Sequence, residues 1–382
     1  MKKINFNVIQ HTPLIHFETH NISNPTIRLT ELKSKFDKFL ISNCTNLKIY
    51  KDEQGRKYLK YKVMIDSDSK IESFSNGSLF FGNMGEGDNK KYSIASNIKI
   101  SFFTFDRDLQ NCINQNFKKF LANTNFGSRQ SKGFGSFFVD EKFDVNLILA
   151  KNVYKITIKN AFQKILVNKK KNIQEYKWRN HLALFYQFLR QGINLKNRNN
   201  ESIFYTKPAI FSYALSKNQV WEKKAIKQHC LSEYFTEQQK KYPSSDVLHS
   251  QKKEFIIRDL LGLSSDQRWM SYKINIKKEN PHITRFKSPI IFKPIKNGND
   301  MDIYFFKDPR SEEKIEDFLD KEFTIIAGKC KMHLSTPKSF DIDEFVEFSK
   351  NINLSKHIET EYHSHFNFKT LQNIYNTFKK VK

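Results

Sequence analysis

The sequence has few of the features that mark secreted, disulfide-rich or membrane-spanning proteins. Its four cysteines lie far apart and form no C-x-x-C pair, so we expect reduced thiols and a cytoplasmic protein. No stretch approaches the roughly 20 apolar residues that span a bilayer. Residues 1–8 alternate polar and apolar side chains, so we expect no secretory signal.

Acidic residues are scarce relative to basic ones. Forty aspartates and glutamates stand against 65 lysines and arginines, which gives a formal net charge of +25. This balance favours a polyanionic partner, although an AT-rich genome would enrich lysine in the same way. Hydrophobic residues make up 38% of the chain, and 36 positions are phenylalanine, so there is enough apolar material for two domains with buried cores.

The first 140 residues show strand and helix patterns in a definite order. Alternation predicts strands at residues 3–8, 59–65, 98–102 and 136–139, and helical spacing predicts helices at about 27–41 and 106–122. Strand, helix, strand, strand, helix, strand is the order of the ferredoxin-like fold, an antiparallel sheet with both helices on one face. The other face is then free for a ligand.

A second domain is expected from about residue 151. Its predicted strands lie at 154–158, 284–295 and 301–306, and its predicted helices at 175–191, 221–239 and within 340–379. We therefore expect an α+β protein with ferredoxin-like domains at residues 1–150 and 151–382, the second carrying additional helices.

Three of only 12 glycines lie in one basic segment, Gly127-Ser-Arg-Gln-Ser-Lys-Gly-Phe-Gly135. Glycine permits positive φ and close approach of the backbone, so successive N–H groups can face an anion. The spacing matches neither a Walker A loop nor a dinucleotide-binding motif. Glycines also serve plain helix-to-strand connections, but the basic residues inside this loop favour phosphate contact.

The stretch from Asn125 to Ser136 resembles the glycine-rich loop of RAMP proteins, which occur in type III CRISPR complexes. His11-Thr-Pro-Leu-Ile15 is similar to the end of the first strand in that family, and Ile27-Arg-Leu-Thr-Glu-Leu-Lys33 to the start of its first helix. The following Ser34-Lys-Phe-Asp-Lys-Phe39 departs from the family's aromatic run. Within the RAMP proteins the resemblance is greatest to the first subunits of Cmr complexes, which carry this loop early and have a second domain after it.

The resemblance implies an RNA-binding structural subunit of a type III effector complex in antiviral defence. Its partners would be CRISPR RNA or single-stranded target RNA and neighbouring RAMP subunits, with no membrane and no cofactor. The predicted RNA contacts come from the loop and from the first helix, whose N-terminal dipole favours phosphate. They are Arg28, Lys33, Gly127, Arg129, Lys132, Gly133, Phe134 and Gly135.

The alternative function is an endoribonuclease that processes CRISPR RNA or cleaves target RNA. Histidine can serve as acid or base in RNA cleavage, and loop aspartates can hold a catalytic metal. Here no spacing fixes a catalytic partner, and surface histidines and turn aspartates are the commoner case. We therefore predict no catalytic residue among the candidates His11, His16, His20, Asp66, Asp68 and Asp88.

Two other segments contain residue types with a functional use. Cys330-Lys-Met-His333 and His363-Ser-His365 carry zinc-ligand types, but neither has a partner pair at finger spacing, so we predict no metal site. In Thr284–Ile295 basic residues alternate with apolar and aromatic ones. That pattern suits single-stranded RNA, or equally a half-buried strand whose lysines face water.

Overall fold

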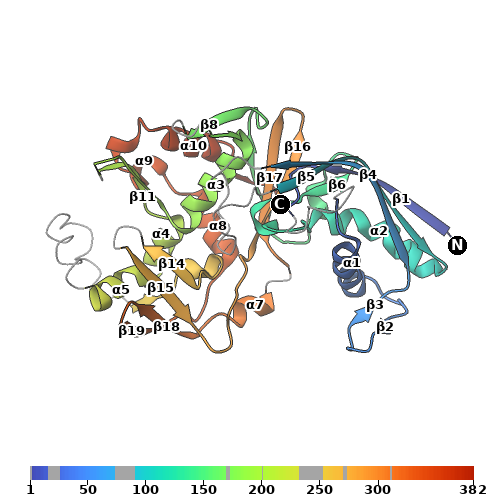
Figure 1. The fold of residues 1–382 in the computed structure, drawn as a ribbon, viewed down its shortest axis with the longest axis horizontal. Helices are drawn as coiled ribbons and strands as arrows, with labels where there is room; N and C mark the ends of the chain where they lie inside the picture. The colour runs from blue at the N-terminus through green and yellow to red at the C-terminus, as the bar shows by residue number, and fades with distance from the viewer. Residues whose placement is uncertain are drawn as a thin grey trace. The chain divides into compact units, whose positions relative to one another are not determined.

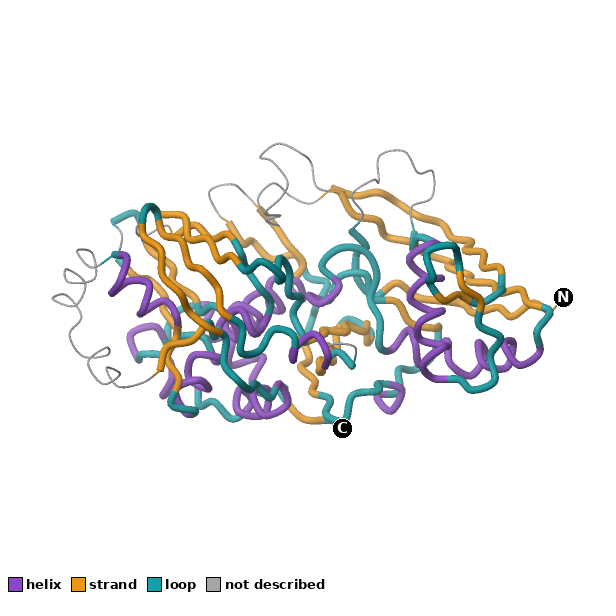
Figure 2. The backbone as a smooth tube through the Cα atoms, turned by 90° about the horizontal axis from the view of Figure 1, so that it is seen from below, coloured by secondary structure: helices purple, strands orange, loops and turns teal. Residues whose placement is uncertain are grey.

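The structure is a computed structural model, and it describes residues 2–15, 26–73, 91–168, 173–199, 201–231, 253–269, 273–309 and 312–382. They form two compact units, the first of residues 1–182, 291–306 and 377–382, and the second of residues 183–290 and 307–376. Both units combine helices and strands (Figure 2). Contacts thus group residues 151–182 with the N-terminal region, and the domain boundary near residue 150 stays a prediction.

The first unit begins with a four-stranded antiparallel sheet in the order β4-β5-β1-β6 (Figure 1). Along the chain the elements run strand, helix, strand, strand, helix, strand, and the first and third strands are central. This is the predicted ferredoxin-like topology. The elements are β1 (Lys2–Gln10), α1 (Leu29–Asn43), β4 (Lys62–Ser73), β5 (Lys91–Thr104), α2 (Arg107–Ala122) and β6 (Phe137–Val139). A small hairpin of β2 (Tyr50–Lys51) and β3 (Lys57–Tyr58) precedes β4.

Aromatic packing joins this sheet to its helices. The ring of Phe36 on α1 lies 5.5 Å from that of Phe102 on β5 and 5.3 Å from that of Phe117 on α2. All three side chains are fully buried. The Asp106 side chain caps α2 by accepting from two backbone N–H groups of the first turn. Helical spacing and a cap therefore place α2 where the sequence predicted it.

A second four-stranded sheet has the order β16-β17-β7-β20. Along the chain α3 follows β7, then come β16 and β17, and α10 precedes β20, so the ferredoxin-like connection recurs. It carries long additions between α3 and β16 and between β17 and α10. This confirms two such domains in an α+β protein. The bounds are β7 (Tyr154–Ile158), α3 (Lys177–Arg190), β16 (Ile290–Asn297), β17 (Asp300–Lys307), α10 (Phe366–Tyr375) and β20 (Lys379–Lys380). The predicted strand at 284–295 thus begins only after Pro289.

The second unit holds another four-stranded sheet, in the order β14-β15-β18-β19. The predicted helix at 221–239 is α5 in its first half, and residues 232–239 lie outside the described residues. Elements here are α4 (Ala209–Ser216), α5 (Glu222–Cys230), β14 (Asp266–Trp269), β15 (Ile274–Glu279), α7 (Glu312–Glu316), β18 (Glu322–Ala327), β19 (Cys330–Ser335), α8 (Ile342–Lys350) and α9 (Leu354–His357). The remaining short strands are β10 (Ile193–Lys196), β11 (Ser202–Thr206), β12 (Gln219–Trp221) and β13 (Lys253–Phe255) in this unit, and β8 (Lys164–Asn168) and β9 (Ile173–Tyr176) in the first.

The cysteines do not form the reduced thiols that the sequence predicted. Cys44, at the end of α1, is bonded to Cys112 on α2, and Cys230 is bonded to Cys330. The partners are 68 and 100 residues apart, so no local spacing reveals them, and only the packing of the elements brings them together. The prediction of reduced thiols is wrong. Among the helices of the described residues, none has the length and apolar character needed to cross a bilayer.

Candidate functional site

The glycine-rich segment connects α2 to β6 as an ordered loop with an unusual backbone. Gly127, Gly133 and Gly135 have φ of 71°, 81° and 66°, and Arg129 also lies in the left-handed region with φ of 58°. Between them Gln130–Lys132 form a single 3-10 turn. The sequence expectation that these glycines adopt positive φ is confirmed.

The loop rests on the segment that follows β1. The backbone N–H of Gly135 donates to the carbonyl of Pro13 at 2.9 Å. The hydroxyl of Thr12 donates to the carbonyl of Gly133 at 2.7 Å and accepts from the N–H of Ser136 at 2.9 Å. A Cβ on Gly127 would lie 2.6 Å from the carbonyl oxygen of Ile15. The two segments that resemble RAMP proteins therefore contact each other directly.

The backbone donors of the loop are occupied by the protein itself. Gly127 donates to the Glu31 carboxylate, Ser128 to the carbonyl of Ile15, and Gly133 to that of Gln130. With Gly135 bonded to Pro13 and Lys132 to Arg129, five N–H groups of the loop have protein acceptors. The expectation that successive N–H groups face an anion is wrong for these five.

Helix α1 is tied to the loop by a lysine that the sequence analysis did not select. Nζ of Lys35 donates to Oε1 of Glu31 at 2.7 Å, to the carbonyl of Asn125 at 2.9 Å and to Oε1 of Gln130 at 2.7 Å. The Glu31–Lys35 spacing of four residues was the available signal. Because Glu31 also accepts from Gly127, the first turn of α1 adjoins the loop, as the resemblance implied.

Of the two α1 cations predicted to contact RNA, Lys33 makes its contacts within the domain. Its Nζ pairs with Asp37 at 2.9 Å, donates to the carbonyl of Leu59 at 2.8 Å and lies 3.9 Å from the ring centroid of Tyr61. Arg28 is the half-buried N-cap residue of α1. The structure therefore places Lys33 in an internal network on the β4 side of α1.

The loop brings two arginines near each other. Burial, and then the positive charge of Arg179, lowers the pKa of the Arg129 guanidinium. Arg179 on α3 forms an ion pair with Glu175, which lies four residues earlier on β9. Phe134 is 4% exposed, and its ring lies 6.0 Å from that of Trp178. Phe134 thus anchors the loop, while Arg129 and the partly exposed Lys132 supply its charge.

A buried lysine lies behind the loop. Lys293 on β16 is fully buried, and its Nζ donates to the carbonyls of Thr124 and Phe137, both at 2.9 Å, and to Oδ1 of Asn125 at 3.3 Å. Burial, and then Lys35, lowers its pKa well below the usual value. The expectation that Lys293 faces water or RNA is wrong, because its Nζ donates hydrogen bonds to three oxygens around the loop.

The comparison with protein families shows where this chain belongs. The sequence model of the Cmr1 N-terminal domain matches residues 1–193, and that of the Cmr1 C-terminal domain matches residues 205–379. The chain belongs to the Cmr1 family. It is therefore a RAMP-type subunit of a type III CRISPR effector complex, which confirms the resemblance seen at the loop.

Other comparisons add little to the Cmr1 assignment. Among solved structures, the apo form of Cmr1 from Pyrococcus furiosus is similar over 80% of this chain and 88% of that chain, with 11% identity and a TM-score of 0.33. A search of curated proteins finds no match.

The candidate nuclease residues of this Cmr1-family chain have ordinary environments where they are described. His11 is buried, and its Nδ1 accepts from the N–H of Lys296 at 3.0 Å. Burial, then Lys293 and Lys296, lowers its pKa to about 3, so the ring is neutral at pH 7. Oδ2 of Asp68 accepts from Asn97 at 2.7 Å. His16, His20 and Asp88 lie outside the described residues.

The candidate zinc segments also have other partners in the structure. Cys330 is in a disulfide, and Nε2 of His363 lies 2.9 Å from the carbonyl of Ile358. His365 caps α10 by accepting from the N–H of Asn367. Within the described ranges, no group of three or more histidine, cysteine or acidic side chains could hold a metal ion.

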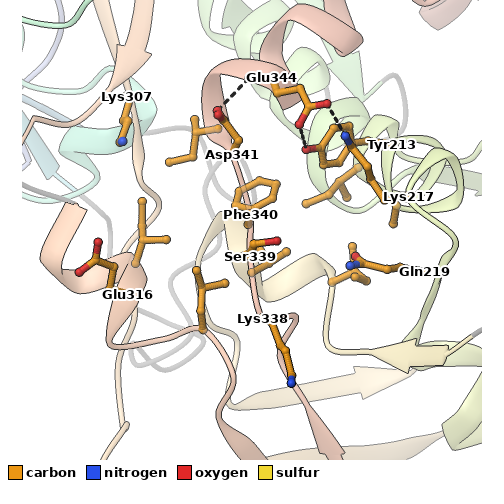
Figure 3. A pocket seen from close by; sticks show the side chains of 17 residues that line it. Tyr213, Lys217, Gln219, Lys307, Glu316, Lys338, Ser339, Phe340, Asp341 and Glu344 are labelled. Carbon is orange, nitrogen blue, oxygen red and sulfur yellow. Dashed lines mark hydrogen bonds and ion pairs between the residues drawn. The ribbon is translucent and has the colours of Figure 1, made fainter.

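The second unit contains a pocket of about 580 Å³ between α4, α8 and the segment that precedes α8 (Figure 3). Glu344 accepts from the hydroxyl of Tyr213 at 2.9 Å and forms an ion pair with Lys217. Three lysines and three acidic residues line the pocket together with apolar side chains, so its charges balance and select no ligand of one sign. The charged residues are Lys217, Lys307, Lys338, Glu316, Asp341 and Glu344.

Proposed function

We propose that this Cmr1-family chain is a structural RNA-binding subunit of its effector complex and that side chains of the glycine-rich loop contact guide or target RNA. The observation that carries the proposal is that Arg129 and Lys132, both partly exposed, lie in a loop that hydrogen bonds from Thr12 and Lys35 hold in place. Burial, and then the positive charge of Arg179, lowers the pKa of the Arg129 guanidinium, and a phosphate bound to it would favour its charged form. The net charge of +25 supports a polyanionic partner for the chain as a whole.

The anchoring of the loop supports the same proposal. Thr12, Lys35 and Lys293 donate to backbone carbonyls of the loop and of the residues just before it, so Arg129 and Lys132 belong to a segment whose backbone is fixed. A frame that is already ordered loses little conformational entropy when RNA binds. The glycines then act by letting the loop pack closely, and the cations act on phosphate.

Titration of purified protein with single-stranded RNA at several salt concentrations tests the proposal. We expect Arg129→Ala with Lys132→Ala to weaken binding and to reduce the salt slope by about 0.7 for each phosphate that the variant no longer binds. Lys329→Ala with Lys356→Ala is the matched control, since both lysines are exposed in the second unit. Equal affinities and slopes for the two double variants would refute the role of the loop.

The neighbouring RAMP subunits are proposed as the protein partners, because the Cmr1 family belongs to a multi-subunit complex. Reconstitution with the other subunits from the same complex tests this. We expect the chain to co-elute with them in size-exclusion chromatography and to contribute RNA cross-links at the loop. Co-elution without any loop cross-link would support the role as a subunit of the complex but contradict the proposed contact between the loop and RNA.

A further inference from the structure

The first ferredoxin-like sheet has a face directed away from α1 and α2. On its central strand β5, Phe103 lies directly opposite Lys3 of β1 on one side and Lys62 of β4 on the other. Nζ of Lys3 is 5.4 Å from the centroid of the Phe103 ring. The adjacent β5 side chains Ile100 and Phe102 are buried on the helix side. Alternation along the strand therefore leaves Phe103 on the opposite face, between two lysines.

The next residues on this face also carry polar or exposed side chains. Asn5 and Met64 flank Ser101, whose hydroxyl donates to Oδ1 of Asn5 at 2.8 Å, and Met64 is 61% exposed. Phe105, the bend residue directly after β5, is 85% exposed. An aromatic ring this exposed contributes almost nothing to the core, so its stability role is small.

A hollow of about 380 Å³ adjoins the face at the start of β4. It is lined by Lys33, Tyr61, Lys62, Val63, Met64 and Phe103. Three of these, Lys62, Met64 and Phe103, belong to the face described above, so face and hollow are continuous. The lining is mostly apolar with two lysines, and the volume is in the range of small-ligand pockets. A nucleobase has the size and the flat apolar surface that such a hollow accepts.

We propose that this face and hollow bind single-stranded RNA through its bases, with stacking on Phe103 and Phe105 and phosphates at Lys3 and Lys62. Sheets of this topology bind bases by stacking them on exposed aromatic side chains. Charge favours RNA over a protein partner at this end of the face, because Lys3 and Lys62 are exposed on either side of Phe103, whereas the acidic residues on the same side of β4, Asp66, Asp68 and Glu72, follow further along the strand. The inference rests on the proposed RNA-binding function and adds a second surface to the loop.

The test compares two probes, a 12-nucleotide uridine RNA and an abasic ribose-phosphate oligomer of the same length. Phe105→Ala should weaken binding of the uridine RNA by about tenfold and leave the abasic oligomer unchanged, since only bases stack. The double variant Lys3→Ala with Lys62→Ala should weaken binding of both probes. It should also reduce the salt slope by about the amount that two phosphates contribute. The control for the aromatic change is Phe366→Ala, since Phe366 is 57% exposed in the second unit. The control for the change of charge is the double variant Lys329→Ala with Lys356→Ala. Thermal melts confirm that each variant folds.

The outcomes separate this inference from the proposed function. If wild-type protein binds neither probe, the RNA-binding function itself is refuted and the inference with it. If Arg129→Ala weakens binding while the sheet variants match their controls, the loop function stands and the sheet inference is overturned. Loss of a neighbouring subunit from the reconstituted complex in Phe105→Ala, with unchanged RNA affinity, would also overturn it, because the face would then bind protein.

Discussion

Glu31 on α1 accepts the backbone N–H of Gly127 with both carboxylate oxygens, at 3.1 and 3.2 Å. The protein therefore supplies its own anion at the first glycine of the loop, where the sequence motif alone predicted a phosphate. Lys35 neutralises this carboxylate from one turn further along the helix. The pair fixes the loop to α1 and at the same time places a negative charge at the first glycine of the loop.

The first prediction concerns this carboxylate. Glu31→Gln retains an oxygen that accepts from Gly127 but removes the negative charge at the first glycine of the loop. We expect RNA affinity to rise by about two- to fivefold, the effect of about 0.5–1 kcal/mol from one partly exposed charge. The variant should lose about 1 kcal/mol of stability, since neutral hydrogen bonds to Lys35 are weaker than charge-assisted ones. Weaker RNA binding in the folded variant would show that the carboxylate itself positions the loop for RNA.

A second prediction tests the packing of the glycines. A Cβ on Gly135 would lie far inside contact distance of the carbonyl oxygen of Phe126, whereas one on Gly298 would meet nothing within 4 Å. Both residues have positive φ, at 66° and 57°. Gly298→Ala should therefore cost about 1 kcal/mol for the backbone conformation alone, and Gly135→Ala about 3 kcal/mol or more. Urea unfolding of the two variants measures the difference, and equal midpoints would contradict the packing role.

The sequence predicts the regular elements of this chain well and its long-range contacts poorly. Helix α2 has both apolar spacing and an N-cap aspartate, and β1 has strict alternation, so local patterns suffice for them. The glycines of the loop also carry their own signal, because no other residue adopts positive φ as readily.

The roles of individual residues are predicted wrongly from the sequence where their partners are distant along the chain. Lys293 resembles a solvent-facing lysine on an alternating strand, yet its acceptors lie 156 to 169 residues earlier. The cysteine pairs are separated by 68 and 100 residues. Such contacts are set by tertiary packing, which no short window of sequence contains.

The third prediction follows from the burial of that lysine. Lys293→Met retains much of the side-chain volume but leaves the carbonyls of Thr124 and Phe137 without their donor. We expect a loss of about 2–4 kcal/mol, the cost of buried acceptors left unsatisfied. Lys287→Met is the control, because Lys287 is exposed shortly before the same strand. Equal melting temperatures for the two variants would show that the Lys293 network contributes no stability.

The fourth prediction is a pH dependence of stability that arises from His11. Its folded-state pKa of about 3 lies below the value of 6.5 for an unperturbed histidine, so the unfolded chain binds the proton more tightly. The contribution of His11 to stability is therefore fully present above pH 6.5 and is lost as the pH falls from 6.5 toward 3. Between pH 7.5 and pH 5 the loss should be about 2 kcal/mol, from about 1.36 kcal/mol for each pH unit below 6.5.

His11→Asn isolates this contribution from the other histidines. Asparagine offers an oxygen to the N–H of Lys296 in place of Nδ1 and does not titrate. Urea unfolding at pH 7.5 and pH 5 should show a smaller loss of stability for the variant than for wild-type protein, by about 2 kcal/mol. If both proteins lose the same amount, His11 titrates normally in the folded state, and its burial behind the glycine-rich loop does not keep the ring neutral.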